Sequence, residues 1–68
     1  MEYTILRKTP TPGGDGTNPG SWILVRRDHD LHPFITAWRA DNATQWDQGN
    51  YHSDLQEAID DYNLRSNR

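Results

Sequence analysis

The sequence predicts a small α+β domain, in which an antiparallel sheet of three or four strands carries one C-terminal helix on one face. Three observations favour this fold. The chain has 68 residues, which suits a single domain, residues 1–68. Two β-prone segments lie in the middle of the chain, separated by a short polar connector. Residues 53–65 combine a helix-capping signal with helical apolar spacing.

Four segments have the composition of strands. Residues 2–7 predict a short first strand, placed at an edge of the sheet. Residues 21–27 and 33–40 predict an antiparallel hairpin, whose second strand opens on a proline. Residues 45–51 predict a last strand, in which Gly49 marks a bulge.

Residues 8–20 separate the first two strands and contain three of the four prolines and four of the five glycines. Proline has no backbone N–H, and glycine weakens regular structure, so we expect neither a helix nor a strand ladder to run through this segment. The prediction is a flexible loop that serves as a connector or, alternatively, as a binding loop.

Residues 53–65 carry several signals of a helix. Ser53 and Gln56 match a capping box, in which the two side chains bond the free backbone groups of the first turn. An apolar stripe follows at i, i+3, i+4 and i+7, made of Leu55, Ala58, Ile59 and Tyr62. Three acidic residues are expected to point largely away from it as a solvated face: Glu57, Asp60 and Asp61.

Both faces of the central hairpin are partly apolar, which is more than one helix can cover. One face carries small aliphatic residues that suit close packing against a helix: Ile23, Val25, Ile35 and Ala37. The other face carries Trp22, Phe34 and Trp38, and residues 8–20 or a partner would cover it. The reverse assignment stays open, because the register is not readable from the sequence. An uncovered apolar face is common at interaction sites.

Composition narrows the class of protein. The net charge is −3, which argues against a basic nucleic-acid binder. The acidic residues concentrate in residues 41–68, which hold six of them against two basic ones. The chain lacks cysteine, an apolar run long enough to span a membrane, and a signal-peptide pattern at its N-terminus. We therefore expect a soluble cytoplasmic protein that does not interact with membranes.

The sequence contains little that suggests catalysis. His29 and His32, with Asp28 and Asp30 beside them, form the single metal-like cluster. Zinc requires three or four tetrahedral ligands, whereas polar turns use the same residue types for local hydrogen bonds, so we expect no metal and no cofactor. Residues 13–16 lack the Lys-Ser/Thr of a phosphate-binding loop, and no nucleophile–base pair is visible. The chain is predicted not to be an enzyme.

The leading hypothesis is a protein-binding or regulatory module whose acidic C-terminal half meets a partner with a basic surface, such as a nucleic-acid enzyme. The expected partner-binding residues are Asp54, Glu57, Asp60, Asp61, Trp22 and Trp38. The alternative is single-stranded nucleic-acid binding by an aromatic and arginine sheet face. That face would use Arg26, Arg27, Arg39 and Trp38. A homodimer that buries the uncovered face is a third hypothesis.

Three segments of the C-terminal half carry a family resemblance. Residues 33–39 read Pro-Phe-Ile-Thr-Ala-Trp-Arg, residues 46–51 read Trp-Asp-Gln-Gly-Asn-Tyr, and residues 58–65 read Ala-Ile-Asp-Asp-Tyr-Asn-Leu-Arg. Residues 33–65 thus resemble small uncharacterised reading frames of bacteria and their phages or plasmids, with a Pro-Phe-Val-Thr-Trp-Arg strand and a Gly-x-Tyr-aromatic strand. Here Ala37 interrupts the first motif, and His52 replaces the second aromatic residue. The resemblance implies a mobile-element accessory protein, for example an inhibitor of a host defence nuclease complex, and carries over no activity.

Overall fold

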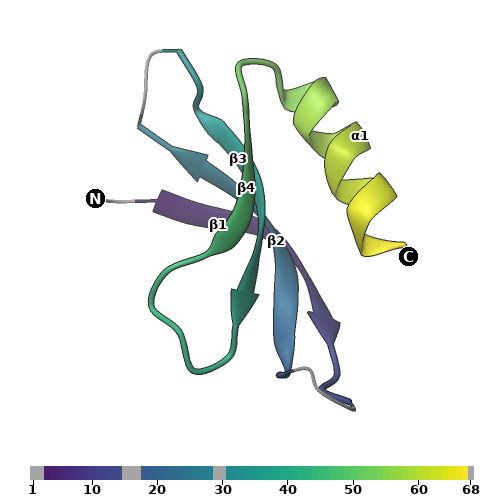
Figure 1. Cartoon of the computed structure of the whole chain (residues 1–68). Helices are drawn as coiled ribbons and strands as arrows, with labels where there is room; N and C mark the ends of the chain where they lie inside the picture. Colours follow the sequence, from purple (N-terminus) through teal and green to yellow (C-terminus); the bar gives the residue numbers. More distant parts are fainter. Residues whose placement is uncertain (1–2, 15–17, 29–30, 68) are drawn as a thin grey trace.

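The computed structural model describes residues 3–14, 18–28 and 31–67. Within them, one antiparallel sheet is followed by a helix. The elements are β1 (Tyr3–Thr11), β2 (Gly20–Arg27), β3 (Phe34–Ala40), β4 (Asp47–His52) and α1 (Leu55–Ser66). The strands lie in the order β1-β2-β3-β4, so each one pairs with its neighbour in sequence. The helix α1 lies on one side of this sheet (Figure 1), and the predicted α+β fold is confirmed.

The strands β2 and β3 pair as the predicted antiparallel hairpin, and they form the centre of the sheet. Its register places Trp22 opposite Trp38 and Val25 opposite Ile35. Residues directly opposite each other in an antiparallel pair point to the same side of the sheet. This register therefore separates an aromatic row from an aliphatic row on the two faces.

The strand β1 is longer than predicted, because it continues through Lys8 to Thr11. Pro10 pairs with Ser21 inside this extension. Since β1 is an edge strand, the missing N–H of Pro10 removes no bond to a second neighbouring strand. The expectation that no strand ladder runs through residues 8–20 is therefore wrong for residues 8–11 and for Gly20, which begins β2. Of the remaining segment, residues 15–17 lie outside the described residues.

The helix packs against the aromatic side of the sheet. Ala58 and Tyr62 are buried against Leu24, and a ring of partly buried residues surrounds them: Trp22, Phe34 and Ile59. The small aliphatic row was expected under the helix, and that assignment is wrong; the reverse assignment holds. The physical reason is size, because the large rings fill the space between a helix and a sheet. Tyr62 also reaches the far edge, where its hydroxyl hydrogen-bonds the hydroxyl of Thr9.

The aliphatic row is buried without help from α1. Ile23, Val25, Ile35 and Ala37 are each 0% exposed, and Ile5 and Trp46 pack over them. Ile5 is in β1 at one edge of the sheet, and Trp46 directly precedes β4 at the other edge. A β-bulge between Ile5 and Arg7 bends β1, whose course changes direction in Figure 1. The sheet therefore curls over its own aliphatic side, which we call the helix-free face.

Gly20 is needed at the start of β2 because Trp38 lies over it. A Cβ atom at this position would come within 2.6 Å of the carbonyl oxygen of Arg39 and would overlap the indole ring of Trp38. At Gly49 the closest atom to a new Cβ would be Cε1 of Tyr51 at 3.4 Å, an ordinary contact distance. The two glycines differ in the space around them.

We predict that Gly20→Ala lowers the free energy of unfolding by about 1–3 kcal/mol, because the indole of Trp38 must leave its position. Urea unfolding followed by tryptophan fluorescence measures the change. Gly49→Ala is the matched control and should cost clearly less. Equal losses for the two variants would contradict the steric role of Gly20.

The bulge expected near Gly49 is present in β4, where two residues of β4 oppose Ala37 of β3. The residue with a positive φ is its neighbour Gln48, at φ 56°. Side chains destabilise this left-handed conformation, which glycine adopts freely.

Gln48→Gly is therefore expected to raise the free energy of unfolding by about 1 kcal/mol. Thermal and urea unfolding give the value. Gln45→Gly, in the exposed turn before β4, serves as the control, since the same substitution there only adds freedom to the unfolded chain. Destabilisation at Gln48 as large as at Gln45 would refute the strain argument.

Candidate functional site

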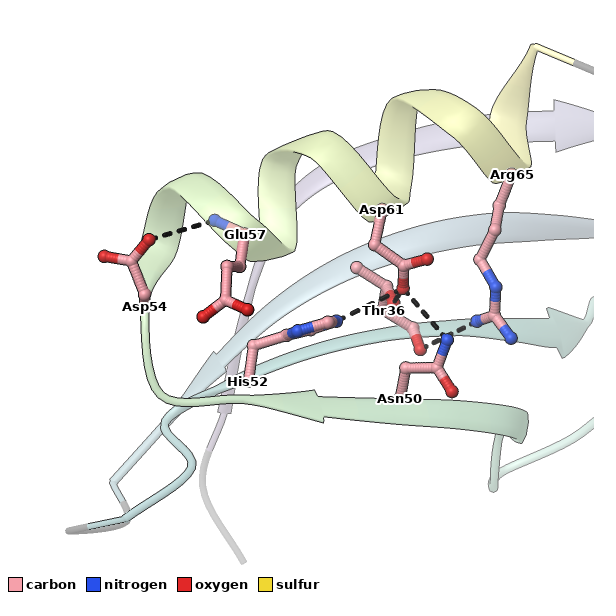
Figure 2. Close-up of polar contacts among 7 residues, drawn as sticks. All are labelled: Thr36, Asn50, His52, Asp54, Glu57, Asp61 and Arg65. Carbon is pink, nitrogen blue, oxygen red and sulfur yellow. Dashed lines mark hydrogen bonds and ion pairs between the residues drawn. The ribbon is translucent and has the colours of Figure 1, made fainter.

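A polar cluster joins the helix to the sheet around the carboxylate of Asp61 (Figure 2). Its Oδ2 atom accepts a hydrogen bond from the hydroxyl of Thr36 in β3 and one from Nδ2 of Asn50 in β4 at 3.1 Å. Nε2 of His52 lies 3.2 Å from the same oxygen. Three side chains of the sheet thus converge on one carboxylate of α1.

Arg65, one helical turn after Asp61, continues this contact with the sheet. Its Nη1 atom donates to the backbone oxygen of Thr36 at 3.1 Å. Its guanidinium carbon lies 4.9 Å from the ring centroid of Trp22, in a cation–π contact. Both charged residues therefore face inward and fix α1 along the sheet.

Two predictions for the helix are wrong: the orientation of Asp61 and the identity of the N-cap residue. Asp61 was expected on the solvated face, but its carboxylate faces the sheet, because Asn50 and His52 lie there within hydrogen-bond distance. Asp54 caps the helix: its Oδ2 accepts from the backbone N–H of Glu57 at 3.1 Å, in the role expected of Ser53. Glu57 and Asp60 stay exposed, as predicted.

The environment of Asp61 sets the direction of its pKa shift. Burial alone would raise the pKa of this carboxyl, but the hydrogen bonds from Thr36, Asn50 and His52 and the charge of Arg65 together hold the pKa below its ordinary value of 3.8. The charged form is thus the one that the fold stabilises. Since the cluster's donors are directed at this one oxygen, its geometry is that of a clamp between helix and sheet.

We predict that Asp61→Asn lowers the free energy of unfolding by about 1.5–3 kcal/mol at neutral pH, because charge-assisted hydrogen bonds are lost. Asp60→Asn, which loses only a bond from Gln56, is the control and should change stability by no more than about 0.5 kcal/mol.

The pH dependence gives a second test of Asp61. A carboxyl whose pKa is lower in the folded state stabilises the fold above its unfolded value, and this contribution disappears as the pH falls through the folded pKa. The difference between wild type and Asp61→Asn should therefore be constant above pH 5, roughly, and shrink below 3.8. A difference independent of pH would contradict the clamp.

The helix-free face carries a second group of polar and aromatic side chains, which we call the aromatic–arginine face. Its members are Tyr3, Arg27, Arg39, Trp46 and Tyr51. The guanidinium carbon of Arg27 lies 4.9 Å from the ring centroid of Tyr51. Nη1 of Arg39 donates to the hydroxyl of Tyr3 at 3.1 Å, and Tyr3 meets Trp46 edge to face at 5.3 Å. Tyr3 is 39% exposed and Tyr51 is 49% exposed, so these rings remain accessible.

The structure divides the residues of the nucleic-acid hypothesis between the two sides of the sheet. Arg27 and Arg39 lie on the helix-free face. Trp38 lies on the other side, where its Nε1 donates to the hydroxyl of Thr11 at 3.0 Å. Arg26, exposed, is opposite Phe34 and also belongs to the helix side. Trp22 packs against the buried residues under α1, and Trp38 is half-buried, so the two predicted tryptophans lie on the helix side, away from Arg27 and Arg39.

Sequence reasoning missed the aromatic partners of the two arginines. Tyr51 is opposite Ile35, and Tyr3 is opposite Arg27, so both share the helix-free face. The alternation of β2 and β3 did place Arg27 and Arg39 with the aliphatic row. The sequence does not give the register of the two edge strands, because each contains a bulge that shifts the pairing.

A hollow of about 330 Å³ opens at one end of the helix-free face. Its lining residues are Tyr3, Lys8, Ser21, Arg39, Asp41, Ala43 and Thr44. They come from β1, β2, β3 and the turn that follows β3. Two cations and several hydroxyl groups therefore surround one depression.

The described residues contain no group of three or more His, Asp or Glu side chains that could hold a metal ion. His32 lies in the described part of the chain, whereas His29 and Asp30 lie outside the described residues. Among these same described residues, α1 is too short and too polar to cross a membrane.

Comparisons of the chain with protein-family models, with curated proteins and with solved structures find no match.

Proposed function

We propose that this chain is a non-enzymatic protein-binding module and that its partner docks on the aromatic–arginine face. One observation carries the proposal: tyrosine, tryptophan and arginine side chains gather on the side of the sheet that α1 leaves uncovered. These three residue types dominate the energetic centres of protein interfaces.

The arginines of this face are held in place before a partner arrives. Arg27 stacks on Tyr51, and its Nε also donates to the backbone oxygen of His32 at 3.2 Å. Arg39 is held by the hydroxyl of Tyr3. Ordering a long side chain on binding costs free energy, so guanidinium groups that are already ordered favour affinity. Guanidinium groups pair best with carboxylates, which points to an acidic segment of the partner.

The acidic helix surface is the weaker candidate. Of the four acidic residues predicted to bind a basic partner, Asp54 caps the helix and Asp61 faces the sheet. Glu57 and Asp60 remain free of the sheet. Asp54 is exposed as well but its side chain is used in the cap, and exposed charges contribute mainly to the rate of encounter.

Single-stranded nucleic acid is also a weaker candidate. The chain has a net charge of −3, whereas binding of a polyanion depends on neutralising several phosphates. The narrower hypothesis of a mobile-element inhibitor of a host defence nuclease is supported only by the resemblance of residues 33–65, and it stays a prediction.

The test compares variants of the two surfaces in a capture experiment from lysate of cells that naturally express the chain. Tyr51→Ala and Arg27→Gln alter the aromatic–arginine face, and Glu57→Gln with Asp60→Asn is the matched helix control. We expect one specific protein to be captured by wild type and by the control, and bound about tenfold or more weakly by the face variants. Circular dichroism verifies that each variant folds.

Two outcomes would overturn the proposal. Capture that survives the face substitutions but fails with the helix control would assign binding to the acidic helix. Tryptophan quenching by a single-stranded oligonucleotide that weakens steeply with added salt would assign the face to nucleic acid instead.

A further inference from the structure

We infer that the hollow between Lys8 and Arg39 is a carboxylate-binding subsite, which receives one acidic side chain of the partner protein. That the carboxylate belongs to a partner protein rests on the proposed function, whereas the site itself is inferred from the charges and hydroxyls that line the hollow.

The strand register places two cations on either side of a buried serine. Ser21 of β2 is directly opposite Arg39 of β3. Lys8 of β1 is opposite Ile23 of β2, so it points to the same side of the sheet as Ser21. Neighbouring strands are about 4.8 Å apart, which puts the backbones of β1 and β3 roughly 10 Å apart, within reach of two long side chains that lean toward each other. Ser21, 3% exposed, forms the floor between them.

The rim of the hollow is fixed by hydrogen bonds within the chain. The backbone N–H of Asp41 donates to the oxygen of Pro19 at 3.0 Å, and that of Ala43 donates to the oxygen of Ala40 at 3.0 Å. Arg39 donates one N–H to the hydroxyl of Tyr3. A guanidinium carries five such donors in a planar fork, so donors remain for a ligand. The rim at the turn after β3 and the position of Arg39 are thus set before binding.

The charge and size of the hollow select a carboxylate. Lys8 and Arg39 are the cations of the lining, and Asp41 is its carboxylate, so the local charge favours an anion with a single charge over a phosphate dianion. The fork of an arginine matches the two oxygens of a carboxylate. The volume is at the lower end of the range of about 300–1,000 Å³ found for ligand pockets, which suits one side chain rather than a whole ligand.

The test is a titration of the isolated chain, followed by ¹⁵N–¹H NMR. The probe is glutamate blocked at both backbone ends, and blocked glutamine is its uncharged match. We expect saturable shifts at Ser21, Thr44 and the Nε–H of Arg39, with affinity for blocked glutamate about tenfold higher than for blocked glutamine. Lys8→Gln should abolish the preference, whereas Arg7→Gln, an exposed charge that faces the helix side of β1, should preserve it.

Several outcomes would overturn the inference. Equal binding of blocked glutamate and glutamine, or no saturable shift at these residues, would remove the subsite. Tighter binding of inorganic phosphate would contradict the choice of a carboxylate. Tighter binding of N-acetylalanine would assign the site to a chain end instead of an acidic side chain. The titration contains no partner protein, so the two proposals can fail independently. A negative titration would not change the capture result, and a negative capture result would not change the binding of blocked glutamate.

Discussion

The structure depends on one constraint: the sheet has two apolar sides, and α1 covers only one of them. The aromatic side meets Ala58 and Tyr62 of the helix. The aliphatic side must be shielded by the sheet itself, and it is, because Ile5 and Trp46 come from opposite edges to pack over a row that is 0% exposed. Curling is made possible by a bulge in each edge strand. In a chain of 68 residues without cysteine, this arrangement completes a second core that no disulfide supports.

The shielding of that second core has a chemical consequence. Residues that cover a curled sheet from its edges end with one side on the core and the other in solvent. Aromatic rings and arginines suit this position, since they combine apolar surface with polar groups at the tip. Trp46 packs over the aliphatic row, and Tyr3 meets its ring edge to face. Arg27 lies over the ring of Tyr51, and Arg39 donates to the hydroxyl of Tyr3. Trp46, which helps to close the core, is therefore also part of the aromatic–arginine face.

The elements were predictable because their signals are local. The apolar spacing of α1 and the β-prone segments of β2 and β3 are read from neighbouring residues. Which side α1 covers was not predictable, since it depends on ring size and on register across strands. The placement of Asp61 was missed for a related reason: its partners Thr36, Asn50 and His52 are distant in sequence. The strand character of Pro10 was missed because proline is excluded from central strands but tolerated at an edge.

The clamp around Asp61 and the aromatic–arginine face differ in how many hydrogen-bond donors they leave available to a ligand. In the clamp, the donors of Thr36, Asn50 and His52 all point at one oxygen of Asp61, and Arg65 lies between Thr36 and Trp22. Those interactions hold the helix on the sheet. On the helix-free face, Arg39 donates one hydrogen bond to the hydroxyl of Tyr3 and, together with Lys8, lines the hollow. A guanidinium has five N–H donors, so Arg39 has donors beyond the one that Tyr3 accepts, and these support the proposed subsite for an anion. On this ground we propose that binding occurs on the side of the sheet opposite the acidic helix.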